Sequence, residues 1–219
     1  MTRWAPERKD TLTALAGEIL HNYGRGRVIV AIDGLAGSGT GAFADDLAEA
    51  LHTKGHAAFR ASMADFQRPR AERERRGAYS AEGFYRESFD YSVFRRVLVE
   101  PFRLGGSTAF VTAAFDASRD AQVESKWTSG PADAILIVDG LFLNRPEISG
   151  IWNFSLWLDA PAAEAEARAA EAEPGDAAAA RRTGGQELYR AQAHPRRTAT
   201  AIVDNTDVEH PRRVFADSC

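Results

Sequence analysis

The sequence predicts an α/β fold with three layers, in which helices cover both faces of a parallel sheet of about five strands. Residues 28–32 (Val-Ile-Val-Ala-Ile) form an unbroken apolar run, which is typical of a strand buried on both faces. Similar short runs recur along the chain, and segments with helical spacing of apolar residues lie between them. Strands that alternate with helices favour a parallel sheet, because the crossover helices then cover both of its faces.

Each expected element follows from a local pattern. Residues 7–24 carry leucines and an isoleucine at helical spacing and end in a glycine, which predicts a helix before the first strand. Residues 43–51 repeat an apolar residue every four positions, which predicts a second helix. Further helices are expected at 91–104 and 162–172. The remaining strand candidates are the apolar runs at 57–61, 109–112, 134–138, 154–158 and 201–203.

Length and composition indicate one globular domain over residues 1–219. The chain is long enough to bury the core of one α/β domain, and no repeat or linker divides it. Its net charge is −4, so neither a nucleic-acid partner nor an anionic membrane surface is expected. The only cysteine is Cys219, which excludes an internal disulfide and a cysteine-based zinc site. The apolar runs are too short to cross a bilayer and the charged start is unlike a secretory signal, so we expect a cytoplasmic protein.

Two segments are expected to form mobile, lid-like parts of the surface. Residues 67–77 are rich in arginine, which suits contact with phosphate, but their interleaved glutamates are equally consistent with a solvated charged segment. Residues 162–182 are rich in alanine and glutamate and are interrupted by Pro174 and Gly175.

A glycine-rich segment, residues 34–41 (Gly-Leu-Ala-Gly-Ser-Gly-Thr-Gly), stands between the first strand and the second helix. In that context backbone N–H groups and the helix N-terminus form an anion site, which predicts a phosphate-binding loop. The P-loop pattern is G-x-x-x-x-G-K-[ST]. Gly34 and Gly39 match it, but Thr40 stands at the lysine position and Gly41 at the hydroxyl position. The lysine for the phosphates and the hydroxyl for Mg²⁺ are therefore missing, and a glycine-rich turn without a ligand is the alternative.

Other segments extend this pattern in order along residues 27–211. Residues 64–70 read Ala-Asp-Phe-Gln-Arg-Pro-Arg, and residues 137–147 read Ile-Val-Asp-Gly-Leu-Phe-Leu-Asn-Arg-Pro-Glu. The first resembles the D-D-F-x-R-P-R segment of the uridine kinase family of P-loop phosphotransferases, and the second resembles its Walker-B-type strand and loop. Residues 85–91, 158–161 and 202–205 are similar to later parts of the same family.

The resemblance implies a P-loop kinase fold and ATP-dependent transfer of a phosphoryl group to the 5′-hydroxyl of a pyrimidine nucleoside, with Mg²⁺. Catalysis of this type rests on positioning and charge neutralisation, together with a carboxylate that receives the hydroxyl proton. The chain departs from the family at several positions. Ala64 stands where the family has the expected base, the second lid arginine falls within residues 171–173, and Thr200 stands where the family often has an aspartate.

The resemblance also supplies the candidate site residues. Asp65 is the candidate base, and Asp139, at the end of an apolar strand, is the candidate metal holder or else a strand-end turn residue. The nucleotide-binding candidates are Gly34, Ala36, Gly37, Ser38, Gly39, Thr40, Gly41, Arg168, Arg181 and Arg182. The substrate-binding candidates are Phe66, Arg68, Tyr85 and Asp90.

Two functions remain open at the level of the sequence. The first is a nucleoside-kinase-like phosphotransferase that uses ATP and Mg²⁺ and acts weakly on a nucleoside or related hydroxyl acceptor. The second is a binding module derived from such a kinase, which retains a nucleotide or phosphate site without turnover. The joint loss of the lysine, the hydroxyl and the base favours the second function, while the retained Gly37-Ser38-Gly39 indicates that the loop keeps its glycines.

Overall fold

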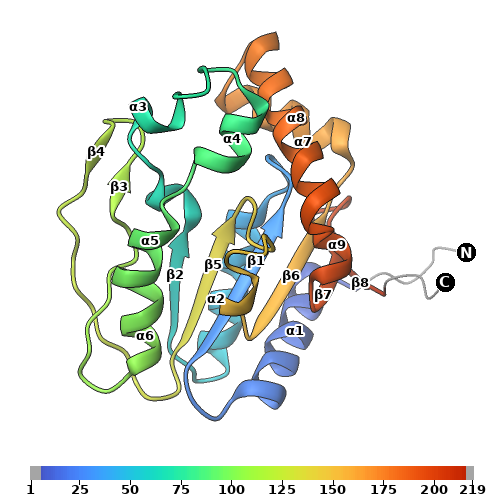
Figure 1. The fold of residues 1–219 in the computed structure, drawn as a ribbon. Helices are drawn as coiled ribbons and strands as arrows, with labels where there is room; N and C mark the ends of the chain where they lie inside the picture. The colour runs from blue at the N-terminus through green and yellow to red at the C-terminus, as the bar shows by residue number, and fades with distance from the viewer. Residues whose placement is uncertain (1–5, 216–219) are drawn as a thin grey trace, which may run out of the picture.

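The computed structural model describes residues 6–215, so Arg3 and Cys219 lie outside the described residues. The described strands form a six-stranded sheet in the order β2-β5-β1-β6-β7-β8, and a separate short ribbon pairs β3 with β4 (Figure 1). Five strands of the large sheet are parallel, as the sequence predicts, and β8 adds an antiparallel edge. The strands are β1 (Val28–Gly34), β2 (Ala58–Ser62), β3 (Phe115–Asp116), β4 (Ala121–Gln122), β5 (Ile135–Gly140), β6 (Phe154–Asp159), β7 (Ala201–Asp204) and β8 (Arg212–Val214).

Helices cover both faces of the sheet, which confirms the three-layer architecture. Two of them, α1 and α2, lie on one face, while α5, α6 and α8 lie on the other. The helices are α1 (Arg8–Tyr23), α2 (Thr40–Thr53), α3 (Arg70–Arg73), α4 (Ala81–Glu87), α5 (Tyr91–Phe94), α6 (Glu100–Leu104), α7 (Ala162–Ala172), α8 (Asp176–Ala193) and α9 (Pro195–Thr198). A π-helical turn, Arg95–Val99, joins α5 to α6, so the helix expected at 91–104 is continuous. No helix of residues 6–215 is long and apolar enough to span a bilayer.

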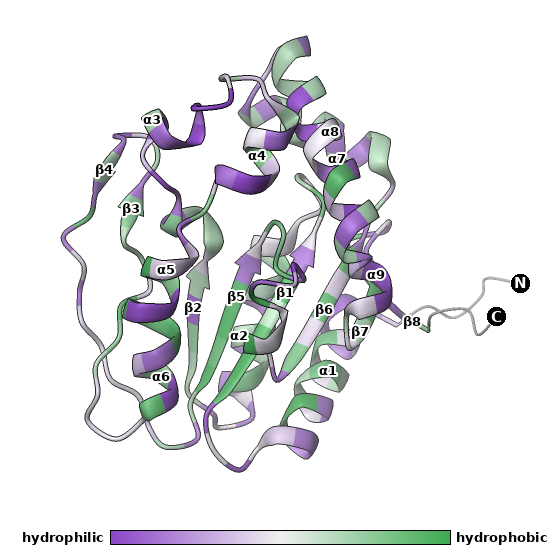
Figure 2. Ribbon diagram, viewed as in Figure 1, coloured by the Kyte–Doolittle hydropathy of each residue, from purple (hydrophilic) through white to green (hydrophobic). Residues whose placement is uncertain are grey.

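The strand periodicity explains how one strand serves two cores. Along β1, Val28, Val30 and Ile32 pack toward α1 and α2, whereas Ile29 and Ala31 pack toward the opposite layer. Successive side chains of a strand point to opposite faces, so a strand covered on both sides needs a continuous apolar run. Figure 2 shows the same apolar character along the central strands, with polar residues concentrated on the segments above their carboxyl ends.

The strand expected at residues 109–112 is wrong. Phe110 forms only an isolated antiparallel bridge with Thr128, and the run does not join the sheet. Its apolar residues are buried for another reason: the Phe110 ring packs edge to face on Phe59 and on Phe102. A short apolar run is found both in buried strands and in loops that pack against a core. Hydrophobic periodicity alone does not distinguish these two structures.

Candidate active site

The glycine loop connects the end of β1 to the start of α2 at the carboxyl edge of the parallel strands, where open α/β sheets bind ligands. Gly37 and Gly39 have φ of 78° and 88°, a backbone conformation that favours glycine. Neither of their N–H groups donates a hydrogen bond to another described residue. Two such groups beside a helix N-terminus have the arrangement that an anion cradle requires, and binding at the loop stays a prediction.

The loop is held from three sides. From α8, the Gln186 Oε1 atom accepts a hydrogen bond from the Ala36 N–H at 2.7 Å. From α7, Arg168 donates to the Gly37 carbonyl at 2.8 Å. After β7, the Asn205 Nδ2 atom donates to the Ser38 carbonyl at 3.1 Å. The loop geometry is therefore set by its glycines and neighbours, without a lysine.

Helix α7 lies directly against the loop. A Cβ atom placed on Gly37 would come 2.0 Å from the Ala165 carbonyl oxygen, so only glycine permits this approach. The break that the sequence predicts at Pro174 and Gly175 separates α7 from α8. The two helices together cover one side of the loop (Figure 1).

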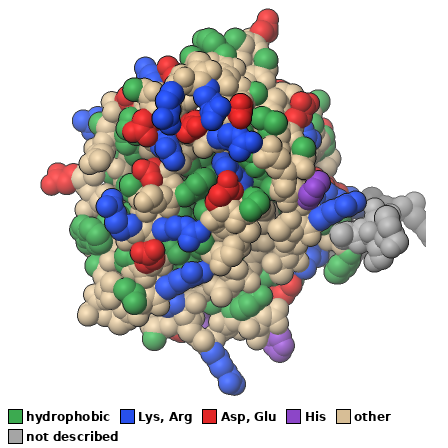
Figure 3. Space-filling model, viewed as in Figure 1, with side chains coloured by type: hydrophobic (Ala, Val, Ile, Leu, Met, Phe, Trp, Pro, Cys, Tyr) green, Lys and Arg blue, Asp and Glu red, His purple; other side chains and the backbone are tan. Residues whose placement is uncertain are grey.

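A cavity of about 750 Å³ opens beside the loop, within the usual range for small-molecule sites. Its walls include Ala36, Gly37 and Thr40 of the loop region and Asp139 at the end of β5. Its roof carries Arg70, Arg73 and Arg181, together with Glu74 and Glu173, and its apolar wall residues include Leu35, Phe84, Phe89 and Leu141. Figure 3 shows basic and acidic side chains mixed on the upper part of this face of the molecule.

Asp139 is bound to an arginine that the sequence analysis does not single out. The Arg60 Nη2 atom, from the edge strand β2, donates to the Asp139 Oδ1 atom at 2.7 Å. The same nitrogen donates to the Gly41 carbonyl at 3.3 Å, and the Arg60 Nε atom donates to Asp45 at 2.9 Å. The one sequence feature that could have indicated this role is the position of Arg60 in the middle of a strand candidate, Ala-Phe-Arg-Ala-Ser.

The donor set at Asp139 does not fit a Mg²⁺ site of the P-loop kind. Such a site uses the P-loop hydroxyl with one or two carboxylates and the substrate phosphates. Here Gly41 has no hydroxyl, and one Asp139 oxygen already accepts from a guanidinium. Within residues 6–215, no group of three or more His, Cys, Asp or Glu side chains is arranged to hold a metal ion.

Ala64 and Asp65 lie on a short 3-10 helix, Met63–Phe66, that follows β2. Ala64 lines the cavity, whereas Asp65 does not. Burial raises the pKa of the Asp65 carboxyl, and the nearby charges of Asp139 and Asp116 raise it further. The carboxyl therefore lies close to the site but outside the cavity wall, while a methyl group occupies the expected position of the base.

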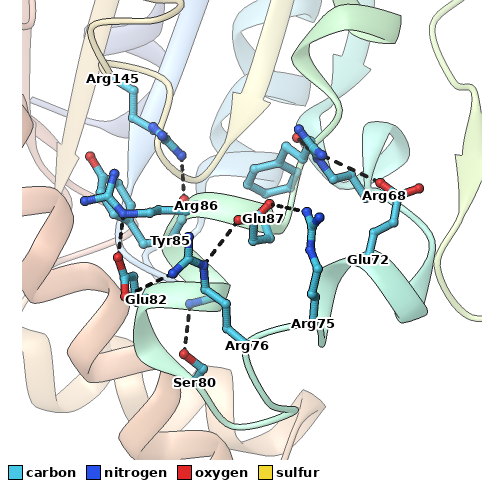
Figure 4. A network of polar contacts seen from close by, with 12 residues as sticks. Arg68, Glu72, Arg75, Arg76, Ser80, Glu82, Tyr85, Arg86, Glu87 and Arg145 are labelled. Carbon is cyan, nitrogen blue, oxygen red and sulfur yellow. Dashed lines mark hydrogen bonds and ion pairs between the residues drawn. The ribbon is translucent and has the colours of Figure 1, made fainter.

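The arginine-rich segment divides into two groups. Arg70 and Arg73 line the cavity, and the Arg70 side chain forms no ion pair with a described acid. Arg75 and Arg76 instead pair with Glu87 of α4, at 3.5 and 3.3 Å (Figure 4). Burial would raise the pKa of Glu87, but the Arg76 hydrogen bond and the surrounding arginine charges outweigh it and lower that pKa.

The three candidate arginines of the segment 162–182, Arg168, Arg181 and Arg182, differ in their contacts. Arg181 lines the cavity, pairs with Glu173 at 2.6 Å and stacks over the Phe84 ring. Arg168 contacts the loop carbonyl and lies outside the cavity wall. Arg182 is buried between α7 and α8, where it binds Glu166 and the Glu173 carbonyl. Arg182 therefore joins the two helices.

Most of the expected substrate-side residues lie one position away from the cavity wall. Phe66 and Tyr85 are core residues, whereas their neighbours Gln67 and Phe84 line the cavity. Asp90 caps α5 through the Val93 N–H at 2.9 Å. Arg68 donates to the Phe89 carbonyl at 3.1 Å and pairs with Glu72 (Figure 4). These residues support the cavity from behind, and none of the four lines it.

A buried carboxyl lies beneath the loop. Asp33 is fully buried and accepts hydrogen bonds from the Asn144 side chain at 2.8 Å, from the Asn144 N–H at 3.1 Å and from the Tyr189 hydroxyl. Burial raises the pKa of Asp33 to about 6, against the lowering effect of these hydrogen bonds. Because Tyr189 belongs to α8, the cluster ties α8 to the end of β1.

Comparison with known proteins identifies the fold. No protein-family model and no curated protein sequence matches the chain. Among solved structures, a possible uridine kinase from Bacillus stearothermophilus has a TM-score of 0.71 at 22% identity, over 89% of this chain and 97% of that one. A candidate fructose transport system kinase from Silicibacter sp. TM1040 has a TM-score of 0.64 at 26% identity, over 86% and 94%. A D-glycerate 3-kinase from Cryptococcus neoformans has a TM-score of 0.52 at 10% identity, over 84% and 86%.

These likenesses extend over most of each chain and agree with the motifs in the sequence. The chain has the fold of the uridine kinase-like P-loop kinases, with a mostly parallel sheet between two helical layers. The solved structures differ from one another in the acceptor that their descriptions name, so the fold alone does not select a substrate.

Proposed function

We propose that the chain is a binding module of the kinase fold, which holds a nucleotide or another small phosphorylated molecule in the cavity and does not transfer phosphoryl groups at a kinase-like rate. The observation that carries the proposal is a contrast within one site. Ala36, Gly37 and Thr40 of the loop region line the cavity. Asp139 is bound to Arg60, and the position of the expected base holds a methyl group.

The composition of the cavity supports a phosphorylated ligand of nucleotide size. Arg70, Arg73 and Arg181 offer planar guanidinium groups that suit phosphate oxygens. Leu35, Phe84 and Leu141 offer apolar surface for a base or another flat group. A ligand with both features would use the loop for its phosphates.

Calorimetry with ATP, ADP, uridine and inorganic phosphate tests the proposal. We expect heats of binding for ADP or ATP and their loss in Thr40→Glu, because that carboxylate would face the phosphates. Thr53→Glu, at the other end of the same helix, is the matched control and should bind like the native chain. Absence of binding for all phosphorylated ligands, or equal binding by Thr40→Glu, would contradict the proposal.

A second candidate function is ATP-dependent transfer to a nucleoside or a related small hydroxyl acceptor, with Mg²⁺. The observation that favours it is the Asp65 carboxyl beside the cavity, whose pKa is raised by burial and by the charges of Asp139 and Asp116, the direction that makes a carboxylate a better proton acceptor. If the chain has measurable turnover, Asp65→Asn should reduce it by about 10²–10⁴-fold, the usual contribution of a general base. A variant with unchanged turnover would exclude Asp65 from that role.

A further inference from the structure

The charge of Asp139 presents a problem for any phosphate in the cavity. Asp139 lines the cavity, and a bare carboxylate there would repel a phosphate group. In P-loop proteins a metal ion at this point neutralises charge between carboxylate and phosphate. The donor set here does not suit that ion, so another positive charge must act if phosphate is to bind.

Arg60 provides that charge in a fixed geometry. Its guanidinium binds Asp139, the Gly41 carbonyl, the Ile137 carbonyl at 3.1 Å and Asp45. The side chain is 23% exposed and that of Asp139 is 10% exposed, so solvent screens the pair only partly. A cation held by contacts from α2 and β5 does not need ligand binding to bring it into place.

Gly41 leaves space for this arrangement. A Cβ atom at residue 41 would lie 3.6 Å from the Asp139 Oδ2 atom, so a larger side chain would extend beside the carboxylate. In the standard pattern that side chain carries the hydroxyl for Mg²⁺. Here the residue at 41 has no side chain, and the guanidinium from β2 lies between its carbonyl and Asp139.

We propose that Arg60 supplies, as a permanent part of the protein, the positive charge that a metal ion supplies in P-loop kinases. Phosphate binding in this cavity is then independent of Mg²⁺, and the preferred ligand is a metal-free di- or triphosphate. Guanidinium is weakly hydrated and always charged, which suits a fixed counter-ion to a buried carboxylate. The inference rests on the proposed function, because it requires that the cavity binds phosphate.

The first experiment uses the native chain. ADP and ATP are titrated by calorimetry in buffer with EDTA and again with excess Mg²⁺. The inference predicts that affinity in EDTA equals or exceeds affinity in Mg²⁺. Binding that requires Mg²⁺ would overturn the inference and leave the proposed binding function intact. No binding under either condition would overturn both.

The second experiment removes the cation. Arg60→Ala bares Asp139, so metal-free affinity should fall about tenfold to a hundredfold, the effect of one lost charge-assisted contact. Added Mg²⁺ should recover part of it, and the double variant Arg60→Ala with Asp139→Asn should recover metal-free affinity. The matched control is Arg25→Ala. Arg25 is exposed and precedes β1, at the amino ends of the parallel strands and away from the cavity. Unchanged metal-free affinity in Arg60→Ala would contradict the inference.

Asp139→Asn alone covers the case in which Arg60→Ala does not fold. This change leaves the Arg60 charge unbalanced beside the cavity, so metal-free ADP should bind more tightly than to the native chain. Equal or weaker binding, with an unchanged thermal midpoint, would overturn the inference.

Discussion

The glycine loop and the roof of the cavity are both candidates for phosphate contact, and they are built on opposite principles. The loop acts through its backbone: its glycines set the shape, the Thr40 side chain carries no charge and Gly41 has no side chain. The roof acts through side chains, with Arg70 and Arg73 on the short helix α3 and Arg181 on the long helix α8. Arg70, Arg73 and Arg181 line the cavity, whereas Arg75 and Arg76 pair with Glu87 outside it. The shape of the loop therefore depends on backbone conformation, whereas the charge of the roof depends on which side chains face the cavity.

The largest expected effect falls on the loop. Gly37→Ala would place a methyl group within 2.0 Å of the Ala165 carbonyl and would also disfavour the positive φ. Overpacking costs about 1–3 kcal/mol and a left-handed backbone about 1–2 kcal/mol more, so we expect a loss of roughly 3 kcal/mol in the free energy of unfolding. Urea denaturation measures it. Gly55→Ala, also at positive φ but with no close neighbour, is the control and should lose only the backbone part.

The next effect concerns the buried carboxyl beneath the loop. A pKa raised to about 6 from 3.8 means that Asp33 stabilises the fold most below about pH 4 and loses this contribution as the pH rises through 6. The difference in unfolding free energy between the native chain and Asp33→Asn should therefore shift by on the order of 3 kcal/mol over that window, with the native chain favoured at low pH. A pH-independent difference would mean that Asp33 titrates normally.

In the roof, we expect an arginine to affect ATP affinity only if its side chain faces the cavity. Arg70→Ala removes a cavity cation without an acidic partner among the described residues, so ATP affinity should fall about tenfold, within the usual range for a charge-assisted contact. Calorimetry measures the change. If Arg70→Ala binds ATP as the native chain does, the roof does not contact phosphate.

The smallest effect is expected for an arginine of the same segment that faces away. Arg75 pairs with Glu87 outside the cavity, and its side chain is 64% exposed. Exposed ion pairs contribute about 0–1 kcal/mol, so Arg75→Ala should change neither stability nor ATP affinity by more than a small amount. An equal loss of affinity in Arg75→Ala and Arg70→Ala would indicate a general effect of charge and would remove the distinction between the two groups.

Much of the fold follows from the sequence because buried strands and amphipathic helices leave periodic patterns. The five parallel strands, the helix at 91–104 and the break at Pro174 were all accessible in this way. The antiparallel β8 was not, because its segment Arg212–Val214 is short and two of its residues are arginines. The prediction of a strand at residues 109–112 was wrong because an apolar run can be buried without forming a strand.

The side-chain geometry of the site was less accessible. The motifs located the loop, Asp139 and the segment 64–70, yet Phe66 and Tyr85 point into the core while adjacent residues line the cavity. On helices of one or two turns, a shift of one residue changes the direction of a side chain by about 100–120°. Arg60 lies outside every motif, four residues before the segment 64–70, and the pairing of β2 with β5 brings it to Asp139.

The central claim is that the chain keeps the cradle for phosphate and lacks the groups for transfer. Its most direct test is ATP-dependent phosphorylation of a panel of nucleosides and small hydroxyl acceptors, with the native chain and the variant Thr40→Lys, Gly41→Thr, Arg60→Ala, Ala64→Asp assayed side by side. We predict no turnover by the native chain and measurable turnover by the variant, because the variant regains the lysine, the hydroxyl, a free Asp139 and the base. Native turnover in the range of about 1–100 s⁻¹, typical of kinases, would contradict the account.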